Sequence, residues 1–194
     1  NSVCQNTNTT LSSKTLGGVW SSSDTNIATI DGGTGEVTGV NAGSVIITYN
    51  VNTGGGCNVS STKSLTVKLA PTATIVLDLE LCDNFDDGQG DNGFVQTFNL
   101  ESRTASILGA QSGLNFTVTY HNSPSEATSG SNPLPSPYEN KIPDLEPVYV
   151  RVTNNSTGCF TDQTSFNLIV NPLPIANFVN DLEVCDDAAD GLSF

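Results

Sequence analysis

The chain has 194 residues, of which 20 are acidic and 6 are basic, so its formal net charge at pH 7 is -14. Nucleic acids and anionic membranes are polyanions, so this charge disfavours them as partners. A single histidine, His121, supplies neither a multi-histidine zinc site nor a histidine-based catalytic relay, and the composition therefore disfavours an enzyme.

The remaining composition is typical of an extracellular β-protein. Apolar and aromatic residues make up 36% of the chain, which is too many for a disordered segment, and Thr, Ser, Asn and Gly outnumber the strong helix formers. No apolar run approaches the roughly 18 residues that a membrane span needs. Methionine is absent even at position 1, and we expect a piece of a longer exported polypeptide.

Alternation of apolar and polar residues predicts strands with one buried face along most of the chain. The apolar faces in chain order are Leu65, Val67 and Leu69; Ile75, Leu77, Leu79 and Leu81; Phe116, Val118 and Tyr120; Val148, Val150 and Val152; and Phe166, Leu168 and Val170. Two short loop helices are predicted, one over 101–108 before Gly109 and one opening at Ser123-Pro124-Ser125-Glu126, where the spacing fits a capping box.

An internal repeat divides the chain. Residues 71–88 and 174–191 align without a gap, and ten of the 18 positions are identical. A period near 100 residues is that of tandem β-sandwiches. We therefore expect modules at 1–70 and 71–173, followed at 174–194 by the first strand and acidic loop of a truncated repeat, which makes an all-β fold of tandem Ig-like β-sandwich modules.

The stretch 19–49 resembles the bacterial Ig-like group 2 module. It contains Trp20-Ser21-Ser22, then Ala28-Thr29-Ile30, then a Gly-Glu-Val-Thr-Gly-Val run from Gly35 to Val40, and finally Ala42-Gly43. That family is a β-sandwich that occurs mainly in surface adhesins and secreted proteins, generally as a spacer. The large apolar surface of Trp20 makes it the expected anchor of the core.

Residues 71–194 resemble the repeats of the giant SprB-like gliding-motility adhesins of Bacteroidota and related type IX-secreted proteins. The shared motifs lie at 82–88, 98–100, 107–113, 118–121, 132–138, 148–154, 157–159 and 168–174. The resemblance implies an extracellular, cell-surface protein that reaches the type IX secretion and gliding machinery through regions outside this segment. The extra glycine-rich segment at 88–94 departs from the usual repeat.

The five cysteines are distributed so that each expected module holds one obvious pair. Cys4 and Cys57 are the only candidates for each other in the first module, and Cys82 and Cys159 in the second, so we predict these two disulfides. Buried free thiols are the alternative. Cys185 aligns with Cys82 and stays unpaired within the segment, because its expected partner would lie in the rest of its repeat.

A calcium site is predicted in the acidic loop that follows Cys82. Asp83, Asn84, Asp86, Asp87 and Asp91 supply closely spaced oxygen ligands of the kind that Ca²⁺ prefers, and the loop recurs with Asp186, Asp187 and Asp190. The spacing is not that of an EF-hand. The alternative is a solvated acidic turn, since Asp, Asn and Gly favour turns for backbone reasons alone.

These patterns favour a structural and adhesive segment of a long exported cell-surface filament, in surface attachment and gliding motility. Its partners would be neighbouring modules and an external surface or polysaccharide, with no nucleic acid. The alternative is a spacer or carbohydrate-binding region of a secreted polysaccharide-degrading enzyme. Hydrolysis by paired carboxylates is disfavoured, because the acids cluster in glycine-rich turns instead of a cleft.

Overall fold

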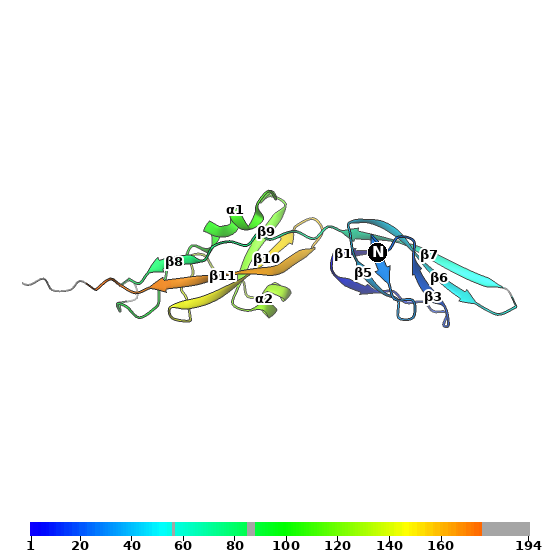
Figure 1. Cartoon of the computed structure of the whole chain (residues 1–194), viewed down its shortest axis with the longest axis horizontal. Coiled ribbons are helices and arrows are strands. Elements are labelled where there is room, and N and C mark those ends of the chain that lie inside the picture. The colour runs from blue at the N-terminus through cyan, green and yellow to red at the C-terminus, as the bar shows by residue number, and fades with distance from the viewer. Residues whose placement is uncertain (56, 85–87, 176–194) are drawn as a thin grey trace, which may run out of the picture.

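The computed structural model describes residues 1–55, 57–84 and 88–175, and these residues form two bodies of β-structure that follow one another along the long axis (Figure 1). The first body holds strands β1 to β7, and the second holds β8 to β11 with three short helical turns. No helix in the described ranges is long and apolar enough to cross a bilayer.

The first body is a sandwich of two sheets. Its strands are β1 (Ser2–Cys4), β2 (Asn8–Thr10), β3 (Val19–Ser22), β4 (Ala28–Ile30), β5 (Glu36–Gly39), β6 (Gly43–Asn52) and β7 (Asn58–Lys68). They form a four-stranded sheet in the order β1-β7-β6-β3 and a three-stranded sheet in the order β2-β5-β4. The long β6–β7 hairpin extends away from the second body (Figure 1).

Alternate residues of the hairpin build the core between the two sheets. Val45, Ile47, Leu65 and Val67 are each at most 3% exposed, and their neighbours in the strands point to solvent. Trp20 is half-buried and packs on this cluster, with its ring centroid 4.5 Å from that of Tyr49. The expected core anchor thus lies at the edge of the sandwich.

The second body has β8 (Leu79–Cys82), η1 (Leu100–Arg103), α1 (Thr104–Leu108), β9 (Phe116–His121), α2 (Pro124–Ser129), β10 (Leu145–Asn154) and β11 (Phe160–Asn171). Its four-stranded sheet has the order β8-β11-β10-β9. In both bodies the first strand pairs in parallel with the last, which forms a hairpin with the strand before it. The fold is therefore all-β and Ig-like, as the sequence predicts.

Several local predictions are confirmed. Val148, Val150 and Val152 are fully buried in β10. As expected, helix α1 ends at Gly109 and helix α2 begins after Ser123. The Ser123 hydroxyl accepts a hydrogen bond from the Glu126 backbone N–H at 3.3 Å, which caps α2.

The apolar face predicted over 75–81 is wrong in its first half. Strand β8 begins only at Leu79, and Ile75 and Leu77 are each 84% exposed. The extended segment before β8 instead packs Ala73 and Val76 on the core. Leu69 is likewise 62% exposed, since β7 ends one residue earlier. Alternation outside a paired strand does not determine which side chains are buried.

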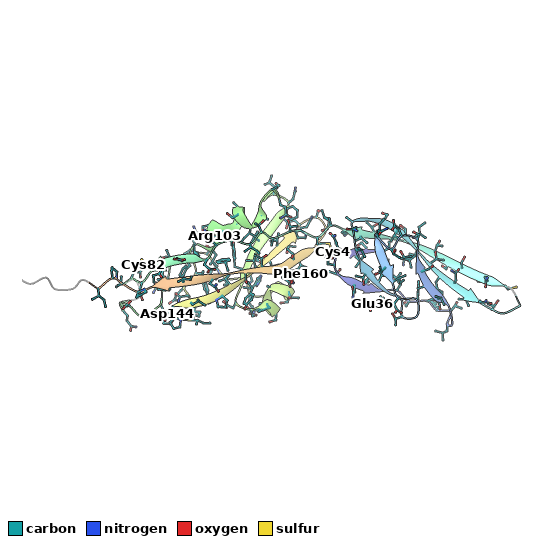
Figure 2. All side chains as sticks on the ribbon, in the orientation of Figure 1. Cys4, Glu36, Cys82, Arg103, Asp144 and Phe160 are labelled. Carbon is teal, nitrogen blue, oxygen red and sulfur yellow. A yellow bond between two sulfur atoms is a disulfide. The ribbon has the colours of Figure 1, made fainter. Side chains whose placement is uncertain are left out.

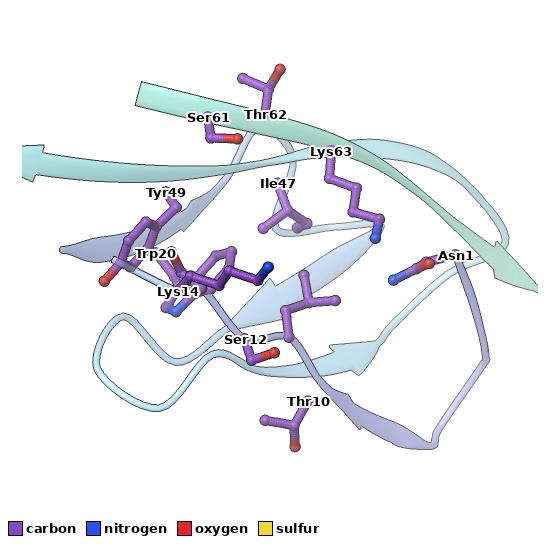
Figure 3. A pocket seen from close by; sticks show the side chains of 12 residues that line it. Asn1, Thr10, Ser12, Lys14, Trp20, Ile47, Tyr49, Ser61, Thr62 and Lys63 are labelled. Atoms are coloured by element: carbon purple, nitrogen blue, oxygen red, sulfur yellow. The ribbon is translucent and has the colours of Figure 1, made fainter. Parts of the chain in front are cut away.

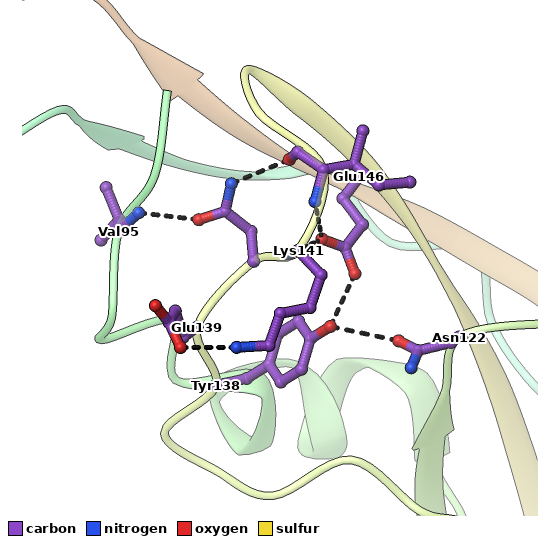
Figure 4. Close-up of polar contacts among 8 residues, drawn as sticks. Val95, Asn122, Tyr138, Glu139, Lys141 and Glu146 are labelled. Atoms are coloured by element: carbon purple, nitrogen blue, oxygen red, sulfur yellow. Dashed lines mark hydrogen bonds and ion pairs between the residues drawn. The ribbon is translucent and has the colours of Figure 1, made fainter. Parts of the chain in front are cut away.

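A buried carboxylate holds the loop before β10. Glu146 is 4% exposed, accepts a hydrogen bond from the Tyr138 hydroxyl at 2.7 Å, and also accepts from the backbone N–H groups of Lys141 and Ile142 (Figure 4). Burial and these contacts with Glu146 raise the pKa of Tyr138 above its usual range. Three donors satisfy the carboxylate, so its role is to position this loop.

The single histidine is buried and fully bonded. His121 is 0% exposed, its Nδ1 lies 2.8 Å from the Ser131 carbonyl oxygen, and its Nε2 lies 2.9 Å from the Thr119 hydroxyl. The carbonyl can only accept, so Nδ1 carries the proton and Nε2 accepts from the hydroxyl of Thr119. This is a neutral imidazole that binds a loop, and burial lowers its pKa below 6.5.

We expect this histidine to make the stability of the protein fall as pH drops below about 6.5. The folded protein holds the neutral form, so the stabilisation is complete above the unfolded pKa near 6.5 and is lost as pH falls toward the lower folded pKa. Thermal unfolding should show the melting temperature falling across this window in the native chain. His121→Asn should be less stable at pH 7, and its melting temperature should change less with pH, whereas an equal slope in both proteins would contradict the assignment.

Candidate functional site: a disulfide-linked junction

A disulfide bond joins the two bodies. It connects Cys4, the last residue of β1, to Cys159, which directly precedes β11, across 155 positions of sequence. The two Cα atoms lie 5.6 Å apart, within the usual range for a disulfide. Figure 2 shows Cys4 beside Phe160 where the bodies meet. Cys159 is 0% exposed, so the bond is shielded from solvent on that side.

The ends of the first body's strands hold Cys4 at this junction. The residue after it, Gln5, donates its backbone N–H to the Lys68 carbonyl at 2.8 Å. Gly39 lies against Cys4, and a Cβ at Gly39 would come within 2.6 Å of the Cys4 carbonyl oxygen. Only glycine fits this close approach of the two backbones. Across the junction, the Lys68 ammonium donates to the Thr157 carbonyl at 3.5 Å.

The connecting chain is the second link between the bodies, and it is bound to the second body. Thr72 and Gln111 exchange two hydrogen bonds, at 3.1 and 2.6 Å. Thr74 donates its backbone N–H to the Ile107 carbonyl at 2.9 Å, and the Thr164 hydroxyl donates to the Ala73 carbonyl at 3.3 Å. The bodies are therefore attached at two points, the chain itself and the disulfide.

A hollow lies between the two bodies at this junction. It measures about 400 Å³, and Gln5, Thr7, Phe160 and Asp162 are among its lining residues. On the second body, the Arg151 guanidinium lies 3.4 Å from the centroid of the Phe160 ring and donates to the Ala127 and Thr128 carbonyls, which rigidifies this end. Domains joined only by a linker usually move relative to each other. The disulfide, as a second covalent link, restricts this motion.

The predicted disulfides, Cys4–Cys57 and Cys82–Cys159, are wrong. Cys4 lies opposite Lys68 at the end of β7, whereas Cys57 directly precedes the start of β7, which has 11 residues. At about 3.3 Å per residue, the two cysteines are separated by some 35 Å along the strand. Cys82 and Cys159 lie at opposite ends of the 12-residue β11 in the same way. Cys57 and Cys82 are exposed free thiols.

The described part of the acidic loop is bonded to the backbone. Asp83 is 2% exposed, and its two carboxylate oxygens accept from the backbone N–H groups of Asn84 at 2.6 Å and Gly93 at 2.7 Å. Asp91 accepts from the Leu173 N–H at 3.0 Å. These contacts close the loop against the end of β11, so they give both carboxylates a structural role.

The other predicted calcium ligands lie outside the described residues. They are Asp86, Asp87, Asp186, Asp187 and Asp190, and Cys185 lies outside as well. Among the residues that the structure describes, no three His, Cys, Asp or Glu side chains gather as a metal site. Calcium binding by this loop stays a prediction.

A hollow in the first body brings cationic and aromatic side chains together. It measures about 410 Å³ and is lined by Lys14, Trp20, Tyr49 and Lys63 with several Ser and Thr hydroxyls (Figure 3). The Tyr49 hydroxyl donates to the Thr15 carbonyl and accepts from the Gly18 N–H, both at 2.8 Å, so its ring is fixed. No sequence pattern indicates this hollow, because its lining residues come from five separate segments.

Comparison with solved structures gives weak likenesses to tandem cadherin repeats. Mouse cadherin-23 EC22-24 is 11% identical over 81% of this chain and 53% of its own, with a TM-score of 0.25. Human mucin-like protocadherin EC1-2 is 12% identical over 90% of this chain and 95% of its own, with a TM-score of 0.26. Zebrafish RET cadherin-like domains 1 to 4 are 14% identical over 90% of this chain and 47% of their own, with a TM-score of 0.25. The chain thus spans about half of the first and third fragments. No curated protein matches.

Two family models match the chain, one on each body. The model of the bacterial Ig-like domain (group 2) matches residues 2–67, in agreement with the resemblance noted around Trp20. The second model matches residues 78–174, which is half of the chain, and its name describes a bond of the kind that joins Cys4 to Cys159. The chain belongs to the family of the Flavobacterium inter-domain disulphide bond domain.

Proposed function

We propose that the chain is a structural and adhesive segment of a long exported cell-surface filament that serves surface attachment and gliding motility. The observation that carries the proposal is the Cys4–Cys159 bond, because a protein that had only to display two Ig-like bodies would not need to join them twice. Disulfides persist in oxidising surroundings, which supports an extracellular location.

The position of the bond supports a role in carrying tension. A pull on the two ends of the chain enters at Asn1, passes through the disulfide at Cys4, and leaves along β11 from Cys159. Residues 5–158 lie outside this covalent path. Neither body has to unfold for the segment to remain intact under load, which suits a filament between a cell and a surface.

Charge and resemblance support the remaining parts of the proposal. A net charge of -14 repels neighbouring filaments of the same kind and keeps them from associating. The partners would be neighbouring modules of the same polypeptide and an external surface or polysaccharide. Export by type IX secretion and attachment to the gliding machinery would use regions outside this segment.

Single-molecule pulling on the two ends tests the load path. With the disulfide intact, unfolding of either body should add almost no length, because residues 5–158 are bypassed. The double variant Cys4→Ser/Cys159→Ser should instead lengthen on the order of 500 Å as both bodies unfold, at up to about 3.6 Å per residue.

The matched control is Cys57→Ser/Cys82→Ser, which removes the free thiols of the described residues and should behave like the native chain. Adding a reductant should convert the native trace to that of the Cys4→Ser/Cys159→Ser variant. Long unfolding steps in the oxidised native chain would contradict a load-bearing bond.

The hollow beside Trp20 favours a second candidate function, binding of an acidic polysaccharide. The first body carries three acidic and three basic side chains, so the net charge that disfavours polyanionic partners belongs to the rest of the chain. Lys14 and Lys63 are two of only six basic residues in the chain, and both line this hollow with an aromatic pair and hydroxyl groups. Cations pair with sugar carboxylates, aromatic faces stack on sugar rings, and hydroxyls exchange hydrogen bonds with sugar hydroxyls. A carbohydrate-binding role could accompany the structural one.

Binding to uronic-acid polysaccharides, measured by calorimetry, tests this candidate. Lys14→Ala/Lys63→Ala should weaken binding about tenfold, since each exposed ion pair contributes up to ~1 kcal/mol, and added salt should weaken binding to the native chain. Lys141→Ala in the second body is the control and should have no effect. Equal affinity for neutral polysaccharides, or no binding at all, would contradict the assignment.

We also propose that the loop after Cys82 binds Ca²⁺, through Asp86 and Asp87 together with the residues nearby. Millimolar Ca²⁺ should then raise the melting temperature, since a ligand that binds only the folded state stabilises it. Asp86→Asn/Asp87→Asn should abolish the rise, whereas Glu101→Gln, which removes a carboxylate elsewhere in the same body, should keep it. An unchanged melting temperature in the native chain would count against the site.

A further inference from the structure

Cys57 and Cys82, the free cysteines of the described residues, occupy the same structural positions as the two bonded cysteines. Cys82 ends β8 and lies opposite Asn171, the last residue of β11, as Cys4 ends β1 and lies opposite Lys68, the last residue of β7. The residue after each cysteine donates its N–H to that opposite carbonyl, Gln5 to Lys68 and Asp83 to Asn171, both at 2.8 Å. Cys82 is therefore the counterpart of Cys4.

Cys57 is in turn the counterpart of Cys159. Each directly precedes the last strand of its body, at the turn of the final hairpin. Each turn is closed by the cysteine carbonyl, which accepts from the Thr53 N–H at 3.1 Å in the first body and from the Asn154 N–H at 2.8 Å in the second. Cys57 therefore lies at the pole that faces away from the second body.

The chain that leaves the second body also resembles the chain that leaves the first. A proline follows the last strand at the same distance in both, Pro71 after Lys68 and Pro174 after Asn171, and the sequences that begin at these prolines are the two copies of the repeat. A module that follows Pro174 would thus approach Cys82 as the second body approaches Cys4.

We propose that Cys82 and Cys57 each form a further disulfide between neighbouring modules. Cys82 is joined to the cysteine before the last strand of the module that follows Pro174, and Cys57 to the cysteine at the end of the first strand of a preceding module. The Cys4–Cys159 bond is the independent observation that these two positions meet at a junction. Both free thiols are exposed, as partners of this kind require.

The bond forms by thiol–disulfide exchange with a disulfide oxidant, such as glutathione disulfide or the disulfide form of a thiol oxidoreductase. The thiolate of one cysteine attacks the oxidant and displaces one of its sulfurs as a thiol. The thiolate of the second cysteine then displaces the other. Two thiols become one disulfide while the oxidant is reduced to two thiols. The inference does not rest on adhesion, because it concerns only how successive modules are joined.

Peptide mapping of the full-length protein from its native cell surface tests the proposal. Free thiols are first blocked with N-ethylmaleimide at acidic pH, and the protein is then digested without reduction and its linked peptides are identified by mass spectrometry. The Cys82 peptide should be linked to one from beyond residue 174, the Cys57 peptide to one from before residue 1, and Cys4 to Cys159 as the internal control.

Cys82→Ser in the full-length protein sharpens the test. It should expose one new N-ethylmaleimide-labelled cysteine, located before the last strand of the following module, and should leave Cys4–Cys159 intact. Blocked free thiols at Cys57 or Cys82 in the native protein would overturn the proposal, as would a bond between Cys57 and Cys82 or between Cys82 and Cys185. Since the map reports linkages alone, loss of adhesion or gliding does not alter its result.

Discussion

The pairing of the first strand with the last strand in each body determines where the cysteines lie. Because β1 runs parallel to β7 and ends opposite Lys68, it brings Cys4 to the pole from which the chain continues. The turn before the last strand is at the other pole. A cysteine at each of these two places cannot meet its neighbour in the same body, but it can meet one in the next. The parallel pair therefore directs disulfides outward.

The disulfide gives the junction a second covalent link, which restricts motions that a single linker would allow. A single linker leaves two Ig-like bodies free to bend and twist, whereas the Cys4–Cys159 bond fixes a second point and removes most of these motions. The hydrogen bonds between Thr72 and Gln111 shorten the free part of the linker further. The two links therefore make this junction stiffer than a single linker would.

The sequence determined local structure well and long-range pairing poorly. Alternation located the buried face of β10, and the capping residue Ser123 located α2, since both depend on near neighbours. The partner of Cys4 depends on which strands pair across most of the chain, and no local pattern reports that. Cys57 and Cys159 each directly precede the last strand of their body, and this placement becomes meaningful only when the first strand is known to pair with the last.

The connectivity also constrains how the protein is made. Cys57 is synthesised before Cys159, so it is the first thiol that an oxidant could join to Cys4. Once β7 has formed, 11 residues of strand keep these two sulfurs apart. If the first body completes its sheet before oxidation, Cys4 and Cys57 cannot be joined, and Cys4 is left to pair with a cysteine of the second body. Folding of the first body thus selects the partner of Cys4, because the completed strand holds the competing thiol at the opposite pole.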